Sequence, residues 1–238
     1  MYVLAHRGYS GKAPENTMAA FELALAAGAD GLELDVHITK DGEVVVIHDH
    51  TLERTTNGRG RVEELTYSEL AQFDAGSWFG EEFRGQRLPK LSEVCELIRG
   101  TDKIFNVELK TGVGFQTLTE KVAELIVAYD LVPNTIISSF NHYALAYAKQ
   151  VKPSIRTGIL YSAGLYEPWE YAKGIGADAL HPNHHSVVPF IVKEAQKHGL
   201  MVNPYTVDEP QDLHRMVEAA VDSVITNQVS RVKELLAK

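Results

Sequence analysis

Short apolar segments rich in β-branched residues alternate along the chain with longer segments in which apolar residues recur at helical spacing. This alternation predicts β-α units around a mostly parallel sheet, which is an α/β fold. The expected strands are residues 2–6, 31–36, 43–48, 103–110, 135–139, 156–160, 177–181, 201–205 and 223–226. The expected helices are residues 17–27, 92–99, 117–129, 142–149, 188–198, 209–217 and 229–236. Nine strands are one more than an eight-stranded α/β barrel needs, so one strand has to lie outside the ring.

The additional strand is residues 43–48. Asp41 and Gly42 form a strong two-residue hairpin turn, which leaves no room for a crossover helix and makes the flanking strands antiparallel. Counting back from this loop sets Asp35 opposite His48. Without the hairpin strand, eight parallel strands remain for the barrel.

Between about residues 49 and 91 the β-α rhythm is lost, and the sequence becomes rich in Gly, Thr and aromatic residues. Segments of this length in compact domains are usually functional lids or packed excursions. We therefore expect an insertion over the barrel mouth, with a helix near residues 68–73, inside a single domain that spans residues 1–238.

Charge and composition exclude several classes of protein. The net charge of -9 and the absence of a run of Lys and Arg argue against a nucleic-acid partner. The lone cysteine, Cys95, fits a reducing compartment and is expected to be a small apolar filler. The first residues lack the features of a secretory signal, and no apolar run is long enough to span a membrane. We expect a cytoplasmic protein without stable membrane association.

Three acidic residues on two expected strands suggest a metal site. Glu33 and Asp35 are two residues apart and therefore point to the same face, and Glu108 repeats this situation on a later strand. For any one of these acids alone, a solvated strand end or an ion pair is an equally good interpretation. Together, at the carboxyl ends of barrel strands, they favour one divalent cation, calcium or magnesium with manganese as a third candidate, rather than zinc or copper.

Histidines and cations follow the same strand ends. His6 closes the first strand beside Arg7, whose planar guanidinium group suits phosphate, and His48 closes the hairpin strand. Lys110 shares a strand face with Glu108, where it forms an ion pair, binds a phosphate oxygen, or does both. The other eight histidines are interpreted as structural, including the adjacent His184 and His185, whose side chains should point apart on an extended segment.

The order of these motifs resembles that of the glycerophosphodiester phosphodiesterase family, and the resemblance covers most of the chain, weakening in the last third. The motifs are His6-Arg7-Gly8, Pro14-Glu15-Asn16-Thr17, Glu33-Leu34-Asp35-Val36, Ile47-His48-Asp49, Leu52-Glu53-Arg54-Thr55-Thr56-Asn57-Gly58, Gly76-Ser77-Trp78-Phe79, Leu88-Pro89-Lys90-Leu91, Val107-Glu108-Leu109-Lys110 and Ser138-Ser139-Phe140.

The resemblance implies a distorted (β/α)8 TIM barrel whose mouth is capped by the insertion, with a divalent cation, two histidines that act as general acid and base, and a cationic pair that holds the phosphate. Glu33, Asp35 and Glu108 would hold the cation, His6 and His48 would be the acid and base, and Arg7 and Lys110 would hold the phosphate.

Two departures from the family pattern concern the last strands. Tyr205 stands in place of a tryptophan that typically precedes Thr-Val, and it still offers a flat face to glycerol. Ser223 and Asn227 stand where the family usually has Gly and Asp. Both departures are expected to alter the walls of the mouth, and therefore substrate preference, without changing the metal ligands or the histidines.

The expected reaction is metal-dependent hydrolysis of a small-molecule glycerophosphodiester to glycerol 3-phosphate and an alcohol. Either the neighbouring glycerol hydroxyl, through a cyclic phosphate, or a water molecule on the cation would be the nucleophile. Two other functions remain open: a lysophospholipase D or phospholipase C-like enzyme, for which Trp78, Phe79 and Phe83 would supply an apolar rim, and a non-catalytic phosphodiester-binding module. The sequence carries no signature of the head group, the physiological ion, the oligomeric state, or which histidine is the acid.

Overall fold

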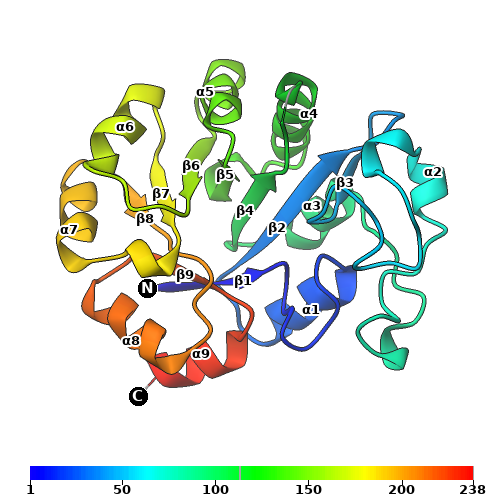
Figure 1. Ribbon diagram of the computed structural model, residues 1–238, viewed down its shortest axis with the longest axis horizontal. Helices are drawn as coiled ribbons and strands as arrows, with labels where there is room; N and C mark the ends of the chain where they lie inside the picture. Colours follow the sequence, from blue (N-terminus) through cyan, green and yellow to red (C-terminus); the bar gives the residue numbers. More distant parts are fainter. Residues whose placement is uncertain (113, 238) are drawn as a thin grey trace.

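The computed structural model of the protein describes residues 1–112 and 114–237. In this part of the chain, eight parallel strands form a ring with helices around its outside (Figure 1). The strands are β1 (Tyr2–His6), β2 (Gly31–Ile38), β4 (Ile104–Leu109), β5 (Thr135–Ser139), β6 (Arg156–Tyr161), β7 (Ala179–Pro182), β8 (Met201–Val202) and β9 (Ser223–Thr226). Neighbouring strands pair in the order β8-β7-β6-β5-β4-β2-β1-β9.

The ring closes between β8 and β9 through the segment that follows β8. The backbone N–H groups of Asp222 and Ile225 donate to Val202 O and Pro204 O, both at 3.0 Å, and Val207 N–H donates to Ile225 O at 2.9 Å. These three bonds take the place of a regular ladder. The predicted distorted TIM barrel is therefore confirmed, with its least regular pairing at this seam.

Nine α-helices occur in the described residues, and the seven predicted from periodicity are present with ends that differ by at most two residues. They are α1 (Met18–Ala26), α2 (Tyr67–Leu70), α3 (Leu91–Ile98), α4 (Phe115–Ala128), α5 (His142–Val151), α6 (Pro168–Ile175), α7 (Pro189–Lys197), α8 (Pro210–Glu218) and α9 (Val229–Leu236). Helix α6 was not predicted, because this eight-residue helix buries only Pro168, Trp169 and Ala172, too few positions to show a helical period. None of the helices in the described ranges is long and apolar enough to cross a membrane.

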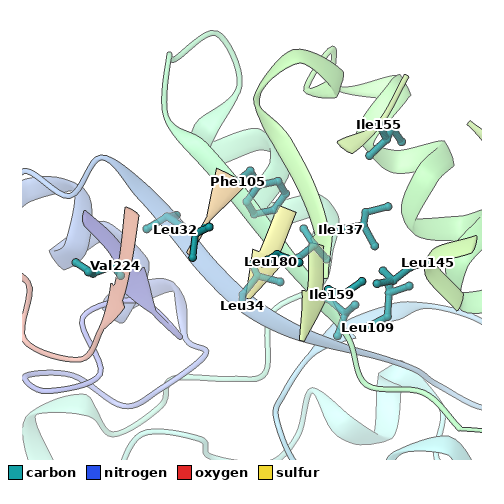
Figure 2. Close-up of a cluster of buried hydrophobic side chains, with 14 of the residues drawn as sticks. Leu32, Leu34, Phe105, Leu109, Ile137, Leu145, Ile155, Ile159, Leu180 and Val224 are labelled. Carbon is teal, nitrogen blue, oxygen red and sulfur yellow. The ribbon is translucent and has the colours of Figure 1, made fainter. Parts of the chain in front are cut away.

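The alternation of side chains along β2 separates the core from the site. All but the last residue of β2 is buried. Leu32 and Leu34 join the hydrophobic layer between the strands and the outer helices, as Figure 2 shows. Glu33 and Asp35 alternate with them and therefore point into the barrel. Cys95 is buried in the hydrophobic layer, which raises the pKa of its thiol to about 12, so its predicted role as a filler fits this position.

The hairpin strand β3 (Val44–Val46) pairs antiparallel with β2, as expected, but the predicted register is wrong by one residue. The structure pairs Val36 with Val46, and the N–H of Ile47 donates to Asp35 O at 3.0 Å, so Ile47 rather than His48 lies opposite Asp35. The cause is a three-residue loop, in which Thr39 N–H donates to Glu43 O at 2.9 Å.

The insertion lies beside β3 in Figure 1. It builds a small hydrophobic cluster of its own. Its buried members are Val45, Ile47, Leu52, Val62, Leu70, Ala75 and Leu88. Val45 and Ile47 alternate with Val44 and Val46, which face the main core, so β3 is shared by the two clusters. The helix expected near residues 68–73 is α2, and Thr66 and Glu69 form a capping box at its start.

Candidate active site

The three predicted acidic ligands meet at the carboxyl ends of β2 and β4. Parallel pairing sets Asp35 beside Glu108, and both carboxylates lie on the inner face of the barrel together with Glu33. One oxygen from each of the three carboxylates lies within 4.8 Å of the other two. All three residues are buried, with at most 8% of their surface exposed. Among the described residues, this is the group of acidic, histidine or cysteine side chains with a geometry that could hold a metal ion.

The electrostatics of this triad fit a divalent cation. Burial and the charge of Asp35 raise the pKa of Glu33 well above its ordinary value and that of Glu108 to about 7. Burial also acts to raise the pKa of Asp35, but Arg7 and Lys110 overcome this effect and lower it. Asp35 Oδ1 is buried without a hydrogen-bond partner. Concentrated negative charge and an unpaired oxygen are both relieved by a hard cation with oxygen ligands.

In the metal-free protein, the contribution of Glu108 to stability is therefore expected to decrease as the pH rises. Between about pH 4.5 and 7 the folded protein keeps a proton on Glu108 that the unfolded chain has released. The contribution of Glu108 to the free energy of unfolding should consequently fall across this range, by up to about 1.4 kcal/mol per pH unit, while buried histidines with a lowered pKa, such as His6 and His37, act in the opposite direction. Urea unfolding in the presence of a chelator at several pH values measures the slope. Glu108→Gln should remove the falling contribution and make the slope more positive, whereas the exposed-site control Glu96→Gln should not change it; equal slopes in all three proteins would contradict the expectation.

Arg7 and Lys110 flank the triad. Lys110 Nζ lies 2.8 Å from Glu108 Oε1 and 3.6 Å from Asp35 Oδ1. Arg7 Nε lies 3.3 Å from Asp35 Oδ2, and the Arg7 backbone N–H donates to Glu33 Oε2 at 2.9 Å. The cationic side chains of Arg7 and Lys110, which are both predicted to bind phosphate, thus face the three carboxylates at the barrel mouth.

His48 lies at the end of the hairpin, where the chain bends away from β3. Its ring is close enough to Asp35 for that carboxylate to act on the pKa of His48, although burial dominates and lowers it. His48 Nδ1 lies 2.6 Å from Asp49 Oδ1, and Arg54 Nε donates to Asp49 Oδ2 at 2.6 Å. Arg54 also donates twice to Glu15, both times at 2.8 Å. The insertion therefore anchors the residue next to His48 to the loop after β1.

His37 lies near the end of β2, paired with Val45 of β3 and with its ring beside that of His50, and it supports this bend. Its Nε2 lies 3.1 Å from the backbone carbonyl oxygen of His48. Burial lowers the pKa of His37 to about 4. The ring is therefore neutral near pH 7 and serves as a structural partner of the His48 backbone, as predicted for the other histidines.

His6 lies at the end of β1, and its side-chain partner is Asn227, one of the two residues that depart from the family pattern at the last strand. His6 Nδ1 lies 2.7 Å from Asn227 Oδ1. Asn227 is therefore a partner of His6 and not simply a wall residue of the mouth, contrary to the expectation that this departure leaves the histidines unaffected. Ser223 is also not a wall residue, because it is buried and its hydroxyl donates to Asn203 Oδ1 at 2.7 Å.

Tyr205 lies on the segment after β8, near Glu108. Burial and the charge of Glu108 raise the pKa of its phenol to about 12, and the hydroxyl donates to Tyr161 O at 3.2 Å. The exposed ring of Phe140 contacts it edge to face, with 6.0 Å between centroids. These two rings form an aromatic wall beside the triad.

His184 and His185 do not point apart as expected. Residues His184–Ser186 form a 3-10 turn, η4, and the two rings lie 4.0 Å apart between centroids. Asp212 Oδ1 lies 3.4 Å from His184 Nδ1. The expectation fails because the segment is not extended: a 3-10 turn sets neighbouring side chains about 120° apart rather than on opposite sides.

The sequence profile of the Glycerophosphoryl diester phosphodiesterase family matches residues 6–231, which is most of the chain. This protein belongs to that family. It is therefore an enzyme, a phosphoric diester hydrolase, and the predicted family resemblance is confirmed.

Relatives and solved structures agree over nearly the whole length. A glycerophosphodiester phosphodiesterase of Caldanaerobacter subterraneus subsp. tengcongensis is 46% identical over 237 residues, 99% of this chain and 98% of the relative. A glycerophosphodiester phosphodiesterase of Bacillus subtilis is 33% identical, over 94% of this chain and 82% of the relative. An Oleispira antarctica phosphodiesterase, solved in complex with the product sn-glycerol-3-phosphate, is 31% identical with a TM-score of 0.94, over 100% of this chain and 97% of that chain.

Two residues of the site, Asn16 and Glu15, belong to a family motif but had no predicted role at the site. Asn16 donates from Nδ2 to Asp35 Oδ2 at 2.8 Å, and Glu15 accepts a hydrogen bond from Arg7 Nη1 at 2.8 Å. Both belong to a polar sequence, Pro14-Glu15-Asn16-Thr17, that directly precedes a helix. Their burial distinguishes these two polar residues from ordinary loop residues. Because burial cannot be read from the sequence, the sequence offered no signal for their role.

Proposed function

We propose that this enzyme hydrolyses glycerophosphodiesters to glycerol 3-phosphate and an alcohol, with one divalent cation, calcium or magnesium, held by Glu33, Asp35 and Glu108. The observation that carries the proposal is the buried triad at the barrel mouth, flanked by Arg7 and Lys110. The product bound to the similar Oleispira antarctica phosphodiesterase supports the same product here. Manganese, which also prefers oxygen ligands, is the third candidate ion.

The substrate phosphate would bind between the triad and the two cationic side chains. When bound, the cation would neutralise charge on the phosphate oxygens as it develops. Arg7 and Lys110 would hold the remaining oxygens, because both side chains already face the carboxylates at the mouth. Tyr205 would offer its ring to the glycerol moiety, while the insertion would help to select the alcohol.

His6 and His48 would transfer the two protons that hydrolysis requires. Burial lowers the pKa of His6 to about 4 and also lowers that of His48, so a neutral ring is available as the base near pH 7, and the ring that acts as the acid has to be in its protonated form. One histidine takes a proton from the attacking hydroxyl group and the other donates a proton to the departing alcohol. Because each Nδ1 is already hydrogen-bonded, each ring turns its Nε2 toward the reaction.

The test is incubation of the purified protein with glycerophosphocholine and calcium, magnesium or manganese in parallel, followed by measurement of glycerol 3-phosphate release. Release that depends on one of these ions, and that stops when a chelator is added, is the expected result. Glycerol 3-phosphate release that persists unchanged in the chelator would contradict the metal-dependent proposal.

Lysophosphatidylcholine in a parallel reaction separates this function from that of a lipid phosphodiesterase. Trp78 and Phe79 of the insertion are 43% and 37% exposed, so an apolar surface is available to an acyl chain. Faster turnover of lysophosphatidylcholine than of glycerophosphocholine would favour the lipid substrate. We expect the reverse order.

A further inference from the structure

A chain of hydrogen bonds runs behind His6, away from the acidic triad. His6 Nδ1 lies 2.7 Å from Asn227 Oδ1, and Asn227 Nδ2 donates to Asp208 Oδ2 at 2.6 Å. The other oxygen of Asp208 accepts from the backbone N–H of Asn227 at 2.8 Å and from the Thr226 hydroxyl at 2.9 Å. The side chain of Asn227 is thus held between a carboxylate and the His6 ring.

This arrangement decides the orientation of the Asn227 amide. The carboxylate of Asp208 accepts hydrogen bonds, so it selects the NH2 end of the amide. The amide oxygen is left to face His6 and the hydroxyl of Ser10, whose Oγ lies 2.6 Å from it. An amide oxygen cannot donate a hydrogen bond, so the hydrogen of the neutral His6 ring has to be on Nδ1.

We propose that Asn227 and Asp208 are positioning residues that hold His6 as the Nδ1–H tautomer, with the lone pair of Nε2 free to accept a proton from the nucleophile. The inference rests on the proposed function, in which His6 transfers a proton. As the new P–O bond forms, the proton of the attacking hydroxyl moves to His6 Nε2. As the old P–O bond breaks, the departing alcohol takes the Nε2 proton of His48, which enters the step in its imidazolium form and leaves it neutral.

The two histidines therefore have different partners. His48 Nδ1 faces the carboxylate of Asp49 at 2.6 Å, whereas His6 Nδ1 faces a neutral amide. At His6 the negative charge is one residue further away, on Asp208. The tautomer of His6 consequently depends on both members of the pair, Asn227 and Asp208, and on their order.

Single substitutions reverse the hydrogen-bond order in predictable ways. Asp208→Asn places a second amide group beside the amide of Asn227. When the Asn227 amide rotates so that its oxygen accepts from the new amide, its NH2 group faces His6 Nδ1 and the hydrogen of the ring has to be on Nε2. Asn227→Asp sets two carboxylates against each other across a 2.6 Å contact. Each single variant is expected to lower kcat by about tenfold or more, with KM changed by less than about twofold, because substrate-binding groups are untouched.

The double variant Asp208→Asn/Asn227→Asp provides the matched test. The new amide at position 208 donates to the new carboxylate at position 227, which still accepts the hydrogen of His6 Nδ1. Every hydrogen bond of the network is preserved with the charge moved by one residue, so kcat should recover to within about threefold of the starting protein. A merely structural role for either residue predicts additive losses instead.

A spectroscopic measurement on the metal-free protein reports the tautomer without turnover. Long-range 1H–15N correlation spectra, with the His6 signals assigned by comparison with His6→Asn, should show hydrogen on Nδ1 in the starting protein and in the double variant. In Asp208→Asn the signal should move toward the Nε2–H form. Circular dichroism and thermal unfolding of each variant establish that it is folded.

Three results would overturn the inference: an Nε2–H ring in the starting protein, single variants with unchanged kcat, or a double variant no faster than the better single variant. Failure of the proposed function looks different, because then His6→Ala itself would retain turnover. If His6→Ala is inactive and the double variant is not restored, the role of the histidine stands and only the positioning pair is refuted.

Discussion

Replacing His6 or His48 with alanine is expected to lower kcat by about two to four orders of magnitude while the protein stays folded and still binds its cation. The size of the effect follows from the usual contribution of a general acid or base. The acidic triad does not include either ring, so cation binding should persist. Steady-state release of glycerol 3-phosphate, together with calorimetric titration of calcium, measures both quantities.

His214→Ala is the matched control, because this histidine is largely exposed on α8 and pairs only with Glu218, at 3.2 Å. It should leave kcat and cation binding unchanged. A His6 or His48 variant with a rate near that of the control would refute its assignment as a proton carrier. A His6 or His48 variant that lost its cation would instead place the ring among the metal ligands.

Asp35→Asn is expected to abolish both cation-dependent activity and cation-dependent stabilisation. In the starting protein, a cation at a hundred times its Kd should add about 2.7 kcal/mol to the free energy of unfolding. For a chain of this size that corresponds to a rise in Tm of about 2–4 °C for each kcal/mol. In the variant the rise should disappear, and turnover should fall by at least about a hundredfold, because the cation contributes several kcal/mol to catalysis.

The control for this experiment is Asp130→Asn. Asp130 is exposed and has a positive φ of 60°, a conformation that asparagine tolerates. Its Tm should rise with the cation as in the starting protein. If Asp35→Asn showed the same rise, the cation would have to bind elsewhere, and the triad would be an ion-paired acidic cluster rather than a metal site.

Much of the site followed from periodicity. A period of two along β2 places Glu33 and Asp35 on one face, and the parallel arrangement of barrel strands brings Glu108 to the same mouth. The motif that begins at His6 then joins the cluster, because β1 ends beside β2. These features depend only on local residue order and on the common direction of the strands.

The errors arose where side chains set the geometry of a turn. The Asp41-Gly42 sequence favours a two-residue loop, but the Thr39 hydroxyl accepts from Glu43 N–H at 2.9 Å and favours a loop with one more residue. This shift moves Ile47 rather than His48 opposite Asp35. His48 nevertheless lies close to Asp35, because the chain leaves β3 and bends directly after Ile47.

By itself, the sequence determined which residues face the inside of the barrel and which strand ends carry acids, histidines and cations. Only the tertiary structure decided the partners of those residues: Asn227 for His6, 221 positions away, and Glu15 for Arg54, 39 positions away. The physical reason is that strand periodicity is local, whereas a hydrogen bond between distant segments depends on the closure of the ring and on the path of each loop. The acidic triad belongs to the first kind of information, and the orientation of the histidines belongs to the second.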